Sequence, residues 1–324
     1  MLIPIALILV GFFLLMWCAD LLVDNASILA ARLGISTFLI GVIIIGFGTS
    51  APELFVSAVA ALENKGNLAL GNALGSNITN IGLVLGSAAL IKSLPVTKSA
   101  ARIDIPIVII FGIIAIALVA DGLLSHWDGF ILLILLAAYL VWTARHSNDV
   151  GSETELEAST TDSAEESSSK STLSVLAITV ASIVLLILAS QMLVKGAVAI
   201  AQILGVGELV IGLTIVAIGT SLPELAAAIA AARKGVHDMI IGNIIGSNIF
   251  NTLGVLGLTG ALRATEIDTN ALWRDFPVML AFTLIMFVFA FTRGILSRRE
   301  GAIMLLGYFA YLAYLVGITV GANN

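Results

Sequence analysis

Apolar residues form long blocks along almost the whole chain, with short polar segments between them. Most blocks exceed the roughly 17 residues that a helix needs to cross the hydrocarbon core of a bilayer. The ten-residue alternation typical of a transmembrane barrel is absent. The pattern predicts an all-α integral membrane protein with ten spans, at about 2–32, 35–63, 67–91, 101–120, 126–145, 172–203, 207–232, 238–262, 272–292 and 301–320.

One segment breaks this pattern between the fifth and sixth spans. Residues 147–171 hold seven acids and one lysine, are rich in Ser and Thr, and show no apolar periodicity. Such a composition is typical of a disordered linker, and it lacks the ligand spacing of a calcium-binding EF-hand. The chain therefore divides into a first half over 1–146, an acidic linker over 147–171 and a second half over 172–324.

Composition supports the membrane assignment. The chain has 324 residues, of which 59% are hydrophobic and only 11% are charged, whereas a soluble domain averages about 25% charged residues. Its single cysteine, Cys18, excludes a disulfide framework. No basic segment precedes the first apolar block, so we expect that span to be retained rather than cleaved as a signal peptide.

Two polar motifs each occur twice. Residues 48–53 read GTSAPE and residues 219–224 read GTSLPE, while 71–86 and 242–257 share ten of sixteen residues. Both pairs are offset by the same 171 positions. Because each half holds an odd number of spans, the second copy must enter the membrane from the opposite side. The sequence therefore predicts two inverted five-helix repeats, an arrangement typical of transporters with a central site.

The distribution of Lys and Arg predicts the orientation, because cytoplasmic loops are enriched in these residues. With the N-terminus outside, eleven fall in cytoplasmic loops: Arg32, Lys92, Lys98, Arg102, Arg145, Lys170, Arg233, Lys234, Arg293, Arg298 and Arg299. Only Lys65, Arg263 and Arg274 fall outside. We expect a multi-pass protein of the cell (inner) membrane, with both termini outside and the linker in the cytoplasm.

Glu53 and Glu224 occupy the same place in the two copies, deep inside apolar spans. A carboxylate at the bilayer centre costs on the order of 3 kcal/mol or more, so it should face a partner or a wet cavity. A Gly and a Pro precede each Glu and weaken the helix there. A helix broken in this way frees backbone carbonyls, which at membrane depth must line protein or water.

The neighbouring polar residues offer oxygen atoms. They are Thr49, Ser50, Ser76 and Asn80 in the first copy and Thr220, Ser221, Ser247 and Asn251 in the second. Hard cations such as Ca2+ and Na+ prefer oxygen ligands. The three histidines fall in loops or at span ends, which argues against zinc or copper. The sequence predicts a cation site at mid-membrane.

Some polar and small residues favour a structural interpretation. Small residues let membrane helices approach closely, and this group is Gly71, Gly75, Gly242 and Gly246. Structural hydrogen bonding is favoured for Asn72, Asn77, Asn243 and Asn248. Interfacial placement or a structural ion pair is favoured for Asp20, Asp24 and Lys195.

At these motifs the sequence resembles the sodium/calcium exchanger family, within the wider cation/calcium antiporters. The family's paired alpha-repeats carry G-T-S-x-P-E on one span and G-S-N-I-x-N or D on the next, and here they cover about 36–90 and 207–261. The resemblance implies a prokaryotic-type antiporter that exchanges Ca2+ for Na+ at one central cluster, without a cofactor.

Carried over residue by residue, the resemblance implies that the ligands are the Glu53 and Glu224 carboxylates and the oxygens of the eight neighbouring residues. Backbone carbonyls near Gly46 and Ala217 would complete the sodium sites. Well-known members carry Asp at the place of Asn251, so this chain has two carboxylates rather than three, which match one Ca2+. Potassium coupling is then disfavoured. We expect no calcium-sensing domain in the short linker, no nucleic acid and no obligate protein partner.

Other functions stay open on the sequence. A Ca2+/H+ antiporter of the same fold is possible, because a protonatable Glu could release Ca2+. A passive cation channel is less favoured. An intramembrane hydrolase using Ser50 or Ser221 would need a base within hydrogen-bond reach, and no His or Lys is expected at that depth. We therefore expect a transporter and no enzyme.

Overall fold

The computed structural model describes residues 2–146, 171–204, 215 and 217–321. In the first half the helices are α1 (Leu2–Leu33), α2 (Thr37–Ile40), α3 (Phe47–Thr49), α4 (Ala51–Leu62), α5 (Gly66–Thr79), α6 (Gly86–Ile91), α7 (Ile105–Leu118) and α8 (His126–His146). In the second half they are α10 (Thr172–Ile203), α12 (Ala217–Thr220), α13 (Leu222–Lys234), α14 (His237–Ile249), α15 (Leu256–Leu262), α16 (Phe276–Arg293) and α17 (Arg298–Gly321). Wider π-helical segments interrupt these helices at η1 (Gly41–Gly46), η2 (Asn80–Leu85), η3 (Ala100–Asp104), η7 (Phe250–Val255) and η8 (Ala271–Asp275).

The prediction of an all-helical membrane protein is confirmed. Within the described residues, eight helices are long and apolar enough to cross a membrane, or nine when a pair bent by 41° between Thr49 and Ala51 counts as one span. The seventh expected span, at 207–232, includes residues outside the described part of the chain. The count of ten spans therefore stays a prediction.

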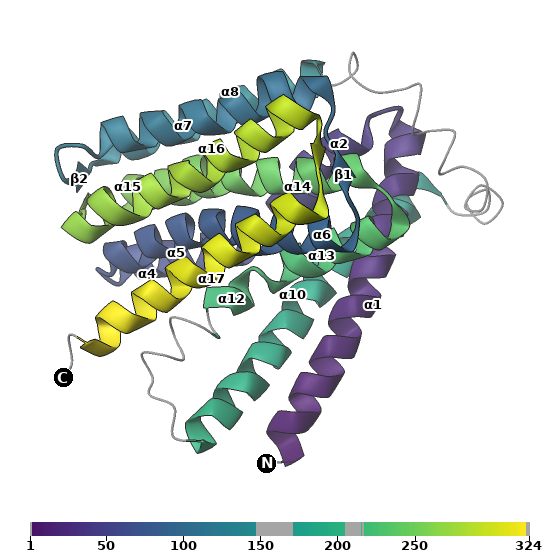
Figure 1. Cartoon of the computed structure of the whole chain (residues 1–324), viewed down its shortest axis with the longest axis horizontal. Helices are drawn as coiled ribbons and strands as arrows, with labels where there is room; N and C mark the ends of the chain where they lie inside the picture. The colour runs from purple at the N-terminus through teal and green to yellow at the C-terminus, as the bar shows by residue number, and fades with distance from the viewer. Residues whose placement is uncertain (1, 147–170, 205–214, 216, 322–324) are drawn as a thin grey trace.

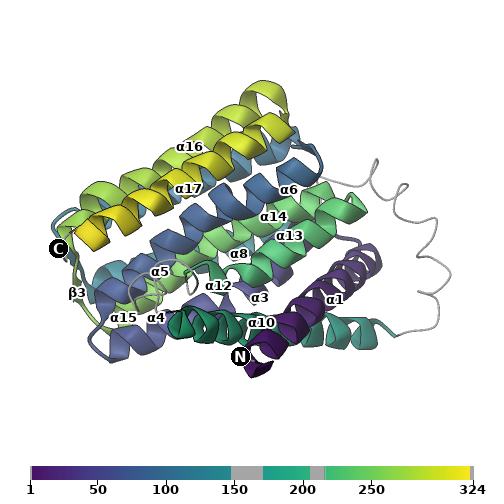
Figure 2. The same ribbon diagram turned by 60° about the horizontal axis from the view of Figure 1, so that its bottom comes forward.

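Two segments form the centre of the bundle (Figures 1 and 2). Within 237–262, an apolar window of 18 residues is entirely buried, and in the corresponding window of 66–91 the buried share is 78%. In Leu2–Leu33 the share is only 22%. That outer helix leaves large apolar side chains such as Phe12 and Phe13 exposed. This is the pattern of a surface that faces lipid rather than water.

The first helix of each half packs against the other. Helices α1 and α10 pack together, and Figure 1 shows them side by side where both project from the rest of the bundle, while Figure 2 shows them crossing. Glycines permit the close approach, because a Cβ at Gly11 would lie 2.9 Å from the backbone nitrogen of Leu193. The two halves are therefore joined at their outer face as well as at the centre.

Two short antiparallel strand pairs also join the halves. Strand β1 (Leu94–Pro95) pairs with β4 (Ile295–Leu296), and β2 (Leu123–Leu124) pairs with β3 (Thr265–Glu266). Strand β3 starts 171 positions after β1, and β4 starts 172 positions after β2. The β1–β4 pair in one place is therefore equivalent to the β3–β2 pair in the other, as expected for two copies related by a two-fold axis.

Candidate cation site

Each of the two Glu-bearing spans is broken just before its Glu. Ser50 (φ −85°, ψ 4°) and Ser221 (φ −92°, ψ 9°) leave helical geometry, and a new helix starts at the next residue with Pro in its first turn. Proline has no N–H and clashes with the carbonyl four residues earlier, but it is well suited to a first turn. Glu53 and Glu224 therefore lie in the first turn of α4 and α13, where the helix dipole favours negative charge.

The two carboxylates face the same buried region. Glu53 is fully buried and Glu224 is 1% exposed, and the two side chains interact electrostatically. The Ser50 hydroxyl donates to Oε1 of Glu224 at 3.1 Å. Ser50 and Glu53 are three positions apart and would share a face of an unbroken helix, whereas in the structure the Ser50 hydroxyl is directed to the carboxylate of the other copy. The break at Ser50 explains this difference.

Several polar atoms at this centre have no hydrogen-bond partner among the described residues. They include both carboxylate oxygens of Glu53, Oε2 of Glu224, the Ser221 hydroxyl and both side-chain polar atoms of Asn80 and Asn251. Buried polar atoms in proteins almost always have a partner, and burial without one is costly. A bound cation would satisfy the oxygens. Outside the masked ranges, no cluster of three or more His, Cys, Asp or Glu occurs, so any cation here must rely on amides, hydroxyls and carbonyls as well.

The remaining candidates surround the carboxylates to different degrees. The Gly46 carbonyl accepts from the Ser247 hydroxyl at 3.2 Å and from the Ser50 backbone N–H at 3.3 Å. The Thr49 hydroxyl donates to the Ile45 carbonyl at 2.8 Å, which leaves its lone pairs available. Ser76 is buried. Thr220 is half-buried and Ala217 is the first residue of α12, so the second copy is described less fully than the first.

Three π-helical segments border the site, and sequence reasoning missed them. Segment η1 ends at Gly46, η2 begins at Asn80, and η7 contains Asn251. A π-turn shifts the hydrogen-bond register of a helix and is frequent at functional sites. The sequence offered no signal for these turns beyond the repeat itself, because a single inserted residue leaves no gap in an apolar pattern.

Close packing between the halves sets the position of α14. A Cβ at Gly242 would lie 2.2 Å from the carbonyl oxygen of Phe38, and one at Gly246 would lie 2.5 Å from that of Val42. The packing interpretation is thus confirmed for these two glycines. It is wrong for Gly71 and Gly75, where an added Cβ would meet no atom within 4 Å. The small size of Gly242 and Gly246 brings α14 against α2 and η1, which places Ser247 beside Gly46.

The asparagines next to the motifs act as braces. Asn72 donates to the backbone carbonyl of Glu53 at 3.1 Å and to the Ser57 hydroxyl at 3.0 Å. Asn77 donates to the Thr252 hydroxyl in the other half at 2.8 Å. These bonds satisfy a carbonyl at the start of α4 and connect the two central segments, as the structural interpretation predicted.

Comparison with known proteins identifies relatives over nearly the whole chain. The family model described as "Sodium/calcium exchanger protein" matches residues 3–145 and 174–317. CaxA of Alkalimonas amylolytica is 41% identical, with 96% of this chain and 98% of the relative covered. The sodium/calcium exchanger MaX1 of Methanosarcina acetivorans is 28% identical over 95% of this chain and 97% of its own length. A solved structure of the sodium-calcium exchanger NCX_Mj, soaked with Na+ and Sr2+, superposes with a TM-score of 0.83 at 31% identity, covering 96% of this chain and 98% of that chain.

Proposed function

The chain belongs to the sodium/calcium exchanger protein family, and from this premise we propose that it is a secondary antiporter that exchanges Ca2+ for Na+ by alternating access. The observation that carries the proposal is the buried carboxylate pair, Glu53 and Glu224, on two broken helices that meet through the Ser50 hydroxyl. Two buried negative charges among unpartnered oxygens suit one divalent cation. The names of MaX1 and NCX_Mj as sodium/calcium exchangers support the choice of ions.

We assign the ion ligands to both copies of the motif. Ca2+ takes six to eight oxygens in flexible geometry, and the set beside Glu53 and Glu224 is Thr49, Ser50, Ser76, Asn80, Thr220, Ser221, Ser247, Asn251 and the carbonyls of Gly46 and Ala217. Na+ would use the same oxygens with fewer ligands for each ion. Competition for one set of oxygens is what couples the two fluxes.

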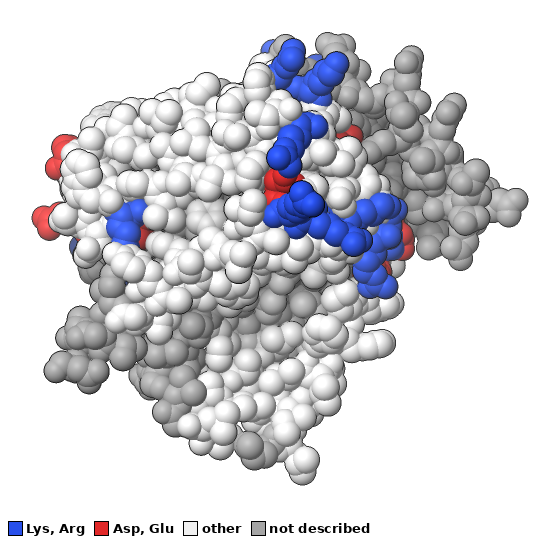
Figure 3. All heavy atoms as spheres, in the orientation of Figure 1, with Lys and Arg blue, Asp and Glu red and all other residues white. Residues whose placement is uncertain are grey.

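We also propose that the basic end of the bundle is cytoplasmic. Figure 3 shows Lys and Arg gathered toward one end of the visible face, the end where Figure 1 labels β1 and α13. There Arg298 donates to the carbonyl of Ile91 at 3.2 Å, and Arg102 lies 5.9 Å from the ring centre of Phe291. This clustering supports the orientation because positive residues are retained on the cytoplasmic side.

Calcium uptake into proteoliposomes tests the proposal. Vesicles loaded with NaCl and diluted into sodium-free medium with Ca2+ should accumulate calcium, whereas vesicles loaded with KCl should not. The double variant Glu53→Gln, Glu224→Gln, inserted normally, should show no uptake above protein-free vesicles. Equal uptake with and without the sodium gradient would contradict sodium coupling.

The same vesicles separate the alternatives. A Ca2+/H+ antiporter would respond to a proton gradient and not to sodium, and a proton ionophore would abolish its uptake. A passive channel would give uptake that needs no counter-ion and that does not saturate with calcium. Saturable uptake that follows sodium in the presence of the ionophore excludes both.

A further inference from the structure

The repeat exchanges charges at two positions outside the cation site. Asp24 on α1 and Lys195 on α10 are 171 positions apart and therefore equivalent. Glu63 at the end of α4 and Lys234 at the end of α13 are equivalent in the same way. Asp24 with Lys234 and Glu63 with Lys195 are therefore two equivalent acid–base pairs, and each combines residues from the two halves. The acid is on the outer helix in the first pair and on the Glu-bearing helix in the second.

At one end of the bundle this pair is formed. The ammonium group of Lys234 lies 2.5 Å from Oδ1 of Asp24 and donates to the Asp20 carbonyl at 2.8 Å. Helix α1 packs along α13 there. The pair therefore ties an outer helix to the helix that carries Glu224 at that end.

At the other end the equivalent pair is open. Helices α10 and α4, both fully described, lack the packing that α1 and α13 make. A cavity of about 190 Å3 lies between them, lined by Val56 on α4, by Gln191 and Lys195 on α10, and by the prolines of both breaks, Pro52 and Pro223. The cavity thus reaches the residues directly before Glu53 and Glu224.

Lys195 and Glu63, the two members of the open pair, do not form an ion pair with each other. Lys195 lines the cavity, and none of the ion pairs between described residues includes it. Glu63 pairs instead with Lys65, two residues away, at 2.7 Å, and both side chains are more than half exposed. Glu63 is therefore held only by a local surface pair, which is worth little and is easily exchanged.

We infer that Asp24–Lys234 and Lys195–Glu63 are two alternating ion pairs, and that each one holds closed the entrance to the cation site on one side of the membrane. The inference rests on the proposed alternating access. In an inverted-repeat transporter, the opposite state is reached when each half adopts the arrangement of the other. In that state α1 moves away from α13 and the Asp24–Lys234 pair breaks. At the other end α10 approaches α4, which brings Lys195 to Glu63. The four residues are positioning residues for the exchange, and none of them contacts the ion.

The expected size of the effect follows from exposure. The Lys234 and Asp24 side chains are 28% and 57% exposed, so each pair should shift the ratio of the two states by about two- to fivefold. The direction in which each variant shifts this ratio distinguishes the two pairs. Breaking the formed pair should raise the population of the opposite state, and breaking the pair that is open here should lower it.

A single reporter cysteine can measure that population. Ala227 on α13 is the equivalent of Val56, and here it is 2% exposed. In a Cys18→Ala background, the cysteine of Ala227→Cys should react with a membrane-impermeant maleimide only in the opposite state, from the basic side. Its labelling rate should rise about two- to fivefold in Asp24→Ala and Lys234→Ala, and fall by a similar factor in Glu63→Ala and Lys195→Ala.

Matched controls make the result decisive. Arg233→Ala removes the neighbouring exposed positive charge and should leave the labelling rate unchanged. The exchanged pair Asp24→Lys with Lys234→Asp should restore the parent rate, which also excludes misfolding of the single variants. Shifts of the same sign from both pairs, or shifts no larger than that of Arg233→Ala, would overturn the inference. The labelling assay requires no ion flux. It can therefore contradict the ion-pair inference while sodium-driven calcium uptake is observed, and it can support the inference while such uptake is absent.

Discussion

Glu53 and Glu224 show how a buried charge is tolerated in this fold. Each begins a helix after a break, so backbone N–H groups of the first turn point toward it and offset part of the cost of burial. The Asn72 side chain donates to the backbone carbonyl of Glu53 at 3.1 Å, and the Ser50 hydroxyl donates to the Glu224 carboxylate at 3.1 Å. Each carboxylate keeps at least one oxygen without a partner in the described chain, and these oxygens are available for a cation.

Neutralising one carboxylate should abolish exchange without unfolding the protein. Glu53→Gln or Glu224→Gln keeps the side-chain volume but leaves one negative charge against Ca2+. Removing one partner of a buried charge interaction costs on the order of 3 kcal/mol, or about a hundredfold in calcium affinity. Equilibrium binding of 45Ca to purified protein measures this. Glu266→Gln, an exposed acid on β3, is the control. Parent affinity in either site variant would remove that residue from the site.

At the level of elements, the contact between α14 and η1 is the most sensitive to added volume. In Gly246→Ala, the new Cβ would lie 2.5 Å from the backbone oxygen of Val42, so α14 must move and carry Ser247 away from Gly46. We expect a loss of about 1–3 kcal/mol in stability together with a large loss of calcium uptake. The thermal unfolding midpoint in detergent and the uptake rate report the two effects.

Gly112→Ala is the matched control for that variant. A Cβ at Gly112 on α7 would meet only side-chain atoms, the nearest at 3.5 Å, which is ordinary contact. Alanine is favoured over glycine within a helix by about 0.5–1 kcal/mol, so this variant should be as stable as the parent or more so. Equal behaviour of the two variants would show that the close contact at Gly246 does not matter.

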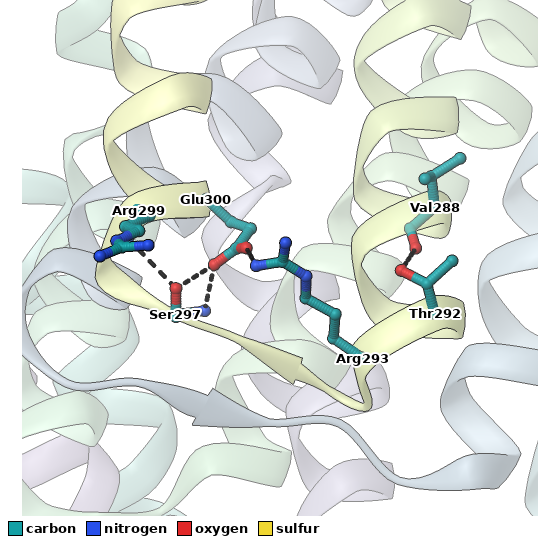
Figure 4. Close-up of polar contacts among 6 residues, drawn as sticks. All are labelled: Val288, Thr292, Arg293, Ser297, Arg299 and Glu300. Atoms are coloured by element: carbon teal, nitrogen blue, oxygen red, sulfur yellow. Dashed lines mark hydrogen bonds and ion pairs between the residues drawn. The ribbon is translucent and has the colours of Figure 1, made fainter.

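The start of α17 is held by a polar cluster beside β4 (Figure 4). Glu300 accepts from the Ser297 backbone N–H at 2.9 Å and from the Ser297 hydroxyl, and it pairs with Arg293 at the end of α16. This arrangement is a capping box with an added ion pair. Thr292 instead bonds within its own helix, to the Val288 carbonyl at 2.6 Å.

Glu300→Ala should therefore lower stability and leave the affinity for calcium unchanged. Loss of the cap costs about 1–2 kcal/mol, and the cluster lies on the loop between α16 and α17 rather than at the site. Asp128 accepts from Ser125 at the equivalent turn, at 2.8 and 2.6 Å, without an Arg. Asp128→Ala should cost less for that reason. Thermal unfolding and calcium binding of both variants test the order, and a reversed order would contradict it.

The sequence predicted most elements of this fold because apolar length and the repeat are strong signals. The first break was expected from Gly48 and Pro52, and it lies at Ser50. What the sequence could not supply was contact across the halves. The bond from Ser50 to Glu224 joins residues 174 positions apart, and the π-turns at Gly46 and Asn80 leave no trace in hydropathy. The ligand set as a whole stays a prediction from the motif.

At the scale of the whole molecule, the halves hold each other through interfaces that do not involve the acidic linker. Helix α1 packs on α10, and β1 and β2 pair with β4 and β3. Helix α10 also has its own start signal, because the Ser171 hydroxyl accepts from the Ser174 backbone N–H at 3.2 Å. The linker residues 147–170 lie outside the described residues. From their composition alone we interpret them as a tether.

Replacing residues 150–168 with a Gly-Ser sequence of equal length should therefore preserve exchange. A tether of the same length keeps the entropy of loop closure nearly constant, and the interfaces between the halves are untouched. We expect calcium uptake within about twofold of the parent and an unchanged thermal midpoint, because a solvated surface segment typically contributes less than about 0.5 kcal/mol. A second variant with Asp and Glu at 150–168 changed to Asn and Gln tests charge separately. If uptake falls in both variants while insertion is normal, the acids act on transport. If it falls only in the Gly-Ser variant, the sequence of the segment matters beyond its charge, and the tether interpretation is wrong.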